Sequence, residues 1–246
     1  MPVAESKEKV RCGTIYGEYY KKNKNMKLSI LVLEESQSAN LPKNAIPFRW
    51  LTHHVSEIYL NLLPKINVNN SRKIVLNFGN QGNDVAFNSV LGCTNIFIED
   101  FDFEKFYSSS TGEQELILID AIKANLVSIY KRTNNNPEDI QSIIAIADKV
   151  IEIEFNLEIP IKKLQKVTKD KQKRIEIYRV LNAEVGEAWK CKIINQKDNS
   201  LLAEHWINEV PSYLDRVDYF KKAEIKENIY TIYNHLGNVT YKYETE

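Results

Sequence analysis

Hydrophobic positions in the first part of the chain switch between the spacing of strands and the spacing of helices. A nearly continuous apolar run in 26–34 predicts a strand that is covered on both faces and lies centrally in its sheet. A second β-prone stretch, 10–21, precedes it across a short polar turn, as in a hairpin. Alternating apolar residues predict two further strands over 74–78 and 95–103.

Two helices are expected among and after these strands. Pro47 can open the first, in which apolar residues recur at steps of three and four until Pro64 ends it. Ser110 and Glu113 have the spacing of a capping box, in which each side chain satisfies a free backbone N–H of the other residue. This motif predicts the second helix, over 113–132.

A third helix start is marked by Asn136 and Pro137. Asparagine is a good N-cap, and proline suits the first helical position because its missing N–H would have no partner there. The apolar spacing then favours a helix that ends near Ile151. The residues from there to Ile159 alternate strictly, so they also fit a strand.

From about residue 174 the spacing changes to short β-prone runs that are separated by turns. These runs are 174–181, 187–194, 201–210, 225–233 and 238–243. They predict an antiparallel meander, in which Trp189, Cys191 and Ile193 share one face of a strand against Lys190 and Lys192. A short helix capped by Ser212, with Asp215 in its first turn, is expected before the fourth run.

The pattern as a whole predicts an α+β protein with an N-terminal mixed α/β portion and a C-terminal antiparallel β portion. We expect the first over 1–160 and the second over 175–246, and the two can pack as a single domain. The basic segment 161–174 connects them, with seven basic residues against one acidic residue from Lys162 to Arg174. Its apolar spacing predicts a solvated connecting helix, and a phosphate-contacting patch is the alternative.

Charge and cysteine usage restrict the class of protein further. Basic and acidic residues number 33 each, so no global positive field favours nucleic acid. Cys12, Cys93 and Cys191 form no CxxC pair, which is typical of a reduced cytosolic protein. The first eleven residues are polar and lack a signal-like apolar stretch, and charges interrupt the most apolar run, 116–130. We therefore expect a cytoplasmic protein with no membrane contact.

Candidate catalytic groups are few and incomplete. His53 and Glu57 are four residues apart on the expected first helix, so they could act as two metal ligands or as a base and its orienting acid. No further ligands have the spacing of a zinc site, and the Gly79–Asp84 loop lacks the pattern of a phosphate loop. We expect no catalytic residue, metal or cofactor, and an enzyme is the less favoured class.

The most unusual segment mixes acids with aromatics. It supplies the candidate partner-binding residues Glu99, Asp100, Asp102, Phe103, Glu104, Phe106 and Tyr107. Aromatic side chains can provide buried contact area, while carboxylates guide the approach of a basic partner. An edge strand with inward phenylalanines and outward acids is the structural alternative. Metal binding by paired carboxylates is a third interpretation.

These observations favour a non-catalytic cytoplasmic protein-binding protein. Its most concrete version is a bacterial immunity protein that neutralises a cognate toxin with a basic domain. One alternative is a small metal-dependent hydrolase or nucleotide-acting enzyme that uses the acids of 99–104. A second alternative is a nucleic-acid-associated module that uses the basic segment from Lys162 to Arg174, which the neutral net charge makes the least favoured.

Overall fold

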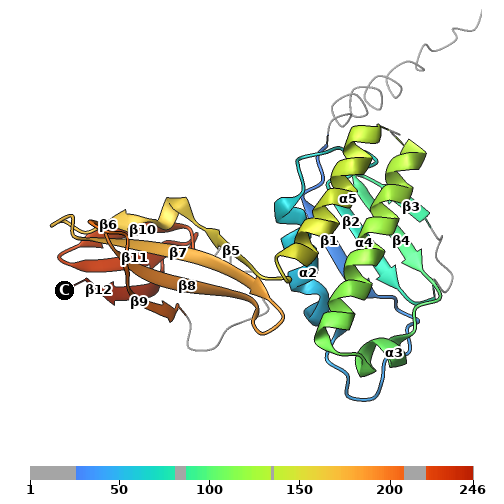
Figure 1. Cartoon of the computed structure of the whole chain (residues 1–246), viewed down its shortest axis with the longest axis horizontal. Coiled ribbons are helices and arrows are strands. Elements are labelled where there is room, and N and C mark those ends of the chain that lie inside the picture. Colours follow the sequence, from blue (N-terminus) through green and yellow to red (C-terminus); the bar gives the residue numbers. More distant parts are fainter. Residues whose placement is uncertain (1–25, 81–86, 134–135, 208–219, 246) are drawn as a thin grey trace, which may run out of the picture.

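The computed structural model describes residues 26–80, 87–133, 136–207 and 220–245, which form two lobes lying side by side (Figure 1). The N-terminal lobe combines helices with a mixed sheet, and the C-terminal lobe consists mainly of antiparallel strands. This confirms the predicted α+β class and the order of its two portions. The C-terminal lobe begins with the strand at 157–160, which pairs with a strand of that lobe.

The sheet of the N-terminal lobe has four strands in the order β1-β2-β4-β3. Their bounds are β1 (Ile30–Glu35), β2 (Lys73–Phe78), β3 (Phe87–Val90) and β4 (Cys93–Ile98). The strands β1, β2 and β4 are parallel, and β3 is antiparallel to β4. The prediction of a central position for the first strand is wrong within the described residues, since β1 lies at one end of this sheet. The expected strand at 10–21 falls outside the described residues.

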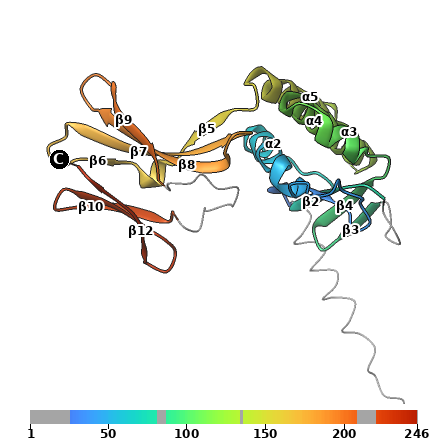
Figure 2. The ribbon, with the colours of Figure 1, turned by 90° about the horizontal axis from the view of Figure 1, so that it is seen from below.

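The helices of this lobe lie on one side of the sheet (Figure 2). They are α2 (Phe48–Leu62), α3 (Phe103–Ser108), α4 (Thr111–Thr133) and α5 (Pro137–Glu152). Alternate residues of β1 and β2, such as Leu33 and Leu76, are almost fully buried in the cluster that joins sheet and helices. Of the helices in the described residues, none has the combination of length and apolarity that crossing a membrane requires.

Two of the three predicted helix starts, at Ser110 and Asn136, are confirmed by their capping contacts. Ser110 N and Oγ both donate to Glu113 Oε2, at 2.8 and 2.7 Å, directly before α4. Asn136 Oδ1 accepts from Glu138 N at 3.2 Å at the start of α5. That helix ends at Glu152, one residue beyond the predicted end, and the strand β5 follows from Leu157 to Pro160.

The C-terminal lobe stacks a five-stranded sheet on a three-stranded one (Figure 2). The first contains β5, β6 (Lys166–Val167), β7 (Lys173–Asn182), β8 (Gly186–Asn195) and β9 (Leu201–Trp206), and the second contains β10 (Lys222–Lys226), β11 (Ile229–Tyr233) and β12 (Val239–Glu244). Trp189, Cys191 and Ile193 of β8 are buried in the cluster between the sheets, together with Tyr230 and Ile232 of β11. The predicted antiparallel meander and the buried face of β8 are thus confirmed. The run expected over 225–233 is not one strand, because a turn at Glu227 and Asn228 separates β10 from β11.

One expected element is wrong, and another is longer than the strand that forms. The basic segment from Lys162 to Arg174 is not a connecting helix, because it forms one 3-10 turn (Lys162–Leu164) and the strand β6, which pairs with the start of β7. The expected strand over 95–103 ends at Ile98, because the following turn leads into α3. The short helix expected at Ser212 lies outside the described residues.

Candidate functional site

Four acidic side chains are exposed at the end of the N-terminal lobe where α3 lies (Figure 1). The parallel strands β1, β2 and β4 all end on this side of the sheet, and the turn 99–102 leads from β4 into α3. Glu99, Asp100, Asp102 and Glu104 lie in or directly after that turn. We call these four residues the acidic turn.

The acidic turn is held by a cap and by a cluster of aromatic rings. Asp102 Oδ1 accepts from Lys105 N at 2.9 Å, which satisfies a free N–H at the start of α3. Phe103 and Phe106 are 6% and 1% exposed, and both pack against Phe48 with ring centroids 5.5 and 5.1 Å away. These two phenylalanines therefore anchor the turn from beneath and are not accessible to a partner, contrary to the sequence-based prediction.

Tyr107 lies at the border of the acidic turn and is half-buried. Its hydroxyl donates to the carbonyl of Ile46 at 2.7 Å. Burial, together with the nearby charge of Glu35, raises the pKa of Tyr107 to about 12, so the hydroxyl stays protonated at neutral pH. Ile46 is 52% exposed and Trp50, in the first turn of α2, is 47% exposed. Neither residue was among the candidates predicted from the sequence, although exposed apolar side chains are typical of interfaces.

The acids of this end do not converge as metal ligands. In the described ranges, no group of three or more histidine, cysteine, aspartate or glutamate side chains could hold a metal ion. The carboxylate of Asp102 is engaged as a helix cap, while Asp100 and Glu104 are exposed. This arrangement does not support the metal-dependent enzyme that was considered for these residues.

His53 and Glu57 belong to a buried network at the junction of the lobes and do not pair with each other. His53 Nε2 lies 2.6 Å from Glu187 Oε2. Arg179 Nε donates to Glu187 Oε1 at 2.7 Å, and Arg179 Nη2 donates to Glu57 Oε2 at 2.8 Å. Glu187 is fully buried and Arg179 is 8% exposed. These four side chains, here called the junction network, connect α2 with β7 and β8.

The junction network holds its buried groups in their ionised forms. Burial opposes ionisation of Glu187, but hydrogen bonds from His53 and Arg179 and the charge of Arg179 lower its pKa below the usual value. Burial also disfavours the Arg179 cation, and the hydrogen bond and charge of Glu187 outweigh this and raise the arginine pKa. Two of its contacts, His53 with Glu187 and Arg179 with Glu57, join α2 to the C-terminal lobe, so we assign the network a structural role.

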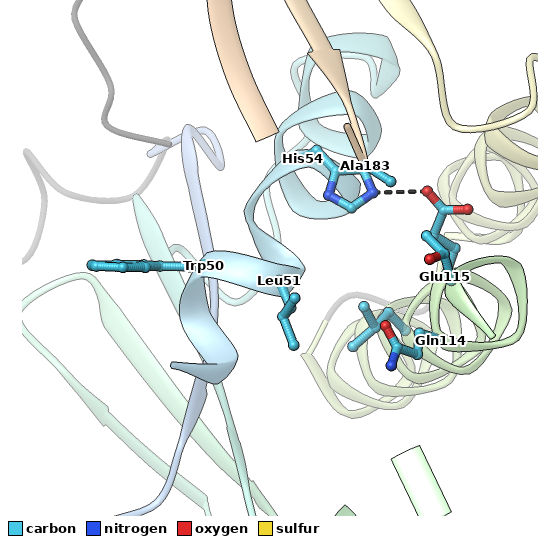
Figure 3. Close-up of a pocket in the computed structure, with 8 residues that line it drawn as sticks. Trp50, Leu51, His54, Gln114, Glu115 and Ala183 are labelled. Carbon is cyan, nitrogen blue, oxygen red and sulfur yellow. Dashed lines mark hydrogen bonds and ion pairs between the residues drawn. The ribbon is translucent and has the colours of Figure 1, made fainter. Parts of the chain in front are cut away.

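A second histidine–glutamate pair lies in a small pocket next to the junction (Figure 3). His54 Nε2 and Glu115 Oε1 are 2.8 Å apart, and they point toward each other from α2 and α4. The pocket has a volume of about 80 Å³ and is also lined by Leu51 and Gln114, whereas the ring of Trp50 points away. This space holds about two or three waters, too few for most substrates.

The remaining candidate groups have structural roles. Cys191 is fully buried, and burial raises the pKa of its thiol to about 11, so the reactive thiolate is disfavoured. Gly79 has a φ of +102°, and a Cβ at this position would lie 3.0 Å from Ser36 Oγ. The glycine thus allows the chain to leave β2 in a left-handed conformation. Cys12 and most of the Gly79–Asp84 loop lie outside the described residues.

Comparisons of this chain with protein families, with curated proteins and with solved structures found no match.

Proposed function

We propose that this chain acts by binding another protein, and that the acidic turn meets a basic surface of that partner. The observation that carries the proposal is that the four carboxylates of the acidic turn are exposed and form no ion pair with a basic side chain of the described residues. Lys105 is the one basic residue in the segment from Glu99 to Tyr107. The partner would supply the missing positive charge.

The rigidity of the acidic turn supports this proposal. The Asp102 cap and the buried rings of Phe103 and Phe106 fix the backbone, so a partner orders few groups when it binds. Exposed carboxylates increase the rate of encounter with a basic surface and set the orientation of the complex. Tyr107 and the exposed side chain of Ile46 add apolar contact area beside the charges.

The specific version of this proposal is a cytoplasmic immunity protein that neutralises a toxin. A toxin domain that acts on nucleic acid presents a basic surface, because it has to bind phosphates. A protein that blocks such a surface needs exposed carboxylates and no catalytic group of its own. The acidic turn meets this requirement.

The proposal can be tested with the purified products of the genes next to the one that encodes this chain. We expect one of them to bind the wild-type protein, with affinity that falls as salt rises. The double variant Asp100→Lys/Glu104→Lys should bind at least about tenfold more weakly, because it places like charges opposite each other. The matched control Asp148→Lys/Glu184→Lys changes the net charge equally at exposed sites outside the acidic turn, and its affinity should stay close to that of the wild type.

Two results would contradict the proposal at different levels. If the two charge-reversed variants bind with the same affinity, the acidic turn is not in the interface. If no adjacent gene product binds, and co-expression of this chain protects cells from none of them, the toxin-neutralising version is wrong.

A further inference from the structure

The C-terminal lobe contains an open hollow of about 360 Å³. The end of the lobe where β7 begins lies away from the N-terminal lobe (Figure 1). The hollow lies where β7 begins and β8 ends, with Lys173 paired to Asn195 across the two strands. Its lining residues come from two separate turns and the start of β9. They are Lys171, Gln172, Lys173, Asn195, Gln196, Lys197 and Leu202.

Three of the lining side chains are lysines, and among the described residues no acid lines the hollow. Lys171 lies just before β7 and Lys173 is the first residue of that strand, whereas Lys197 lies in the turn between β8 and β9. Lys173 Nζ donates to the carbonyl of Thr245 at 2.8 Å, which positions this ammonium group without neutralising its charge. The fold thus brings together basic residues that the sequence does not place in one segment.

The two aspartates of these turns accept hydrogen bonds from backbone N–H and hydroxyl groups of neighbouring residues. Asp170 Oδ1 accepts from Gln172 N at 3.0 Å and from Thr168 Oγ1 at 2.6 Å. Asp198 Oδ1 accepts from Ser200 N at 2.9 Å and from its hydroxyl at 2.7 Å. These hydrogen bonds lower the pKa of both carboxyls, so they stay ionised. With Lys169 included, four lysines still outnumber the two aspartates, and the local field is positive.

Of the three amide residues that line the hollow, Asn195 and Gln196 have their side-chain oxygens engaged. Asn195 Oδ1 accepts from Lys197 N at 2.9 Å, and Gln196 Oε1 accepts from Arg174 Nη1 at 3.1 Å. Because the oxygen of each amide already accepts a hydrogen bond, we expect its NH2 group, a hydrogen-bond donor, to be the group that contacts a ligand. A site that combines ammonium groups with amide N–H donors is complementary to a multiply charged oxyanion.

We propose that this hollow binds a ligand through its phosphate groups. Its volume lies within the range of about 300–1,000 Å³ that is usual for small-molecule sites. Leu202, which is 51% exposed, adds an apolar wall that a sugar or a base can contact. Such phosphates can belong to a free polyphosphate or nucleotide, or to the backbone of a nucleic acid. The inference does not depend on the acidic turn, which belongs to the other lobe.

The test uses isothermal titration of the full chain with tripolyphosphate and, separately, with a single-stranded oligonucleotide of about 15 nucleotides, long enough to cover one such site. We expect saturable binding of at least one probe at low salt. The variant Lys171→Gln/Lys197→Gln should bind at least tenfold more weakly. The control Lys43→Gln/Lys65→Gln removes two exposed lysines from the N-terminal lobe and should bind like the wild type.

The two sources of phosphate give different results. If the natural ligand is a free polyphosphate or nucleotide, we expect tripolyphosphate to bind and to displace the oligonucleotide. If the natural ligand is a nucleic acid, we expect the oligonucleotide to bind more tightly than tripolyphosphate. The slope of log affinity against log salt should then be about −2 for three lysine contacts. Either result supports the hollow as a phosphate site.

Three outcomes would overturn the proposal. The first is the absence of saturable binding of both probes in about 50 mM salt, where phosphate contacts are strong. The second is an equal loss of affinity in the two lysine variants, once circular dichroism has shown that both are folded. The third is that amide chemical-shift changes caused by the bound probe exclude Lys171, Gln196 and Lys197.

Discussion

The junction network and the acidic turn both concentrate carboxylates, but they treat them in opposite ways. Glu187 is fully buried and uses both oxygens, one with His53 and one with Arg179. Asp100 and Glu104 are exposed and have no basic partner in the described residues. The comparison suggests a division of roles, in which buried carboxylates are engaged in holding the lobes together and exposed carboxylates remain available for a partner.

The energies of the two arrangements differ accordingly. A buried ion pair stabilises little relative to an apolar replacement, but removing one member leaves a charge that neither water nor protein compensates. An exposed carboxylate is solvated whether or not a partner is present, so its replacement changes the free energy of unfolding little. Substitutions in the two regions should therefore differ by several kcal/mol.

The largest effect is expected for Arg179→Met, which removes the cation from the junction network. Glu187 would keep only His53 as a partner, and the free energy of unfolding should fall by about 3–5 kcal/mol. Urea denaturation measures this loss. Lys222→Met is the matched control, because the Lys222 side chain is 70% exposed and solvent screens its ion pair with Glu224, so the loss should be much smaller. Equal losses of unfolding free energy in the two variants would show that the junction network stabilises the fold no more than a surface ion pair does.

Lowering the pH should remove part of the same stabilisation. The pKa of Glu187 is lower in the folded state than its unfolded-state value of 4.5. The ionised carboxylate therefore stabilises the fold fully above pH 4.5, and this stabilisation is lost as pH falls through the folded-state pKa. Wild type and Glu187→Gln should therefore differ most in unfolding free energy near neutral pH and converge below about pH 4.5. Denaturation series at several pH values measure this difference. Glu184→Gln, at an exposed residue, should show no such convergence, and a constant difference for Glu187→Gln would contradict the assignment.

The sequence predicts the elements of this network much better than its contacts. The apolar spacing of α2 identifies a helix with His53 and Glu57 four residues apart. Their partners are 134 and 122 residues away in the chain, on β8 and β7. Local periodicity says which face of an element is buried, but it contains no information about which distant charge will meet that face. The role of Glu187 therefore could not be predicted from its place in an alternating run.

The acidic turn illustrates the same limit at shorter range. The sequence identifies the segment as unusual, and the alternation of phenylalanines with acids favours a strand. The chain turns instead, because Asp102 caps α3 and the rings of Phe103 and Phe106 reach the core through helical spacing. The choice between these structures depends on the aromatic cluster around Phe48, which is formed by tertiary packing.

An intermediate effect is expected where an acid of the turn has a structural contact. Asp102→Ala removes the cap of α3 and should lower the free energy of unfolding by about 1 kcal/mol. Asp102→Asn should keep most of this stability, because asparagine caps equally well without the charge. Urea denaturation of both variants separates capping from charge. An equal loss in both would mean that the charge of Asp102, and not its hydrogen bond, stabilises the turn.

The smallest effect on stability is expected for Asp100→Lys/Glu104→Lys, the variant designed to abolish partner binding. Both side chains are solvated, and reversing their charge relieves repulsion within the acidic turn, so the free energy of unfolding should change by less than about 0.5 kcal/mol. Urea denaturation at low and at high salt measures this change. A loss above about 1 kcal/mol, reduced by salt, would show that these carboxylates already have a basic partner within the chain. Unchanged stability with weakened binding would instead place their role in recognition, because the same substitution would then affect only the complex.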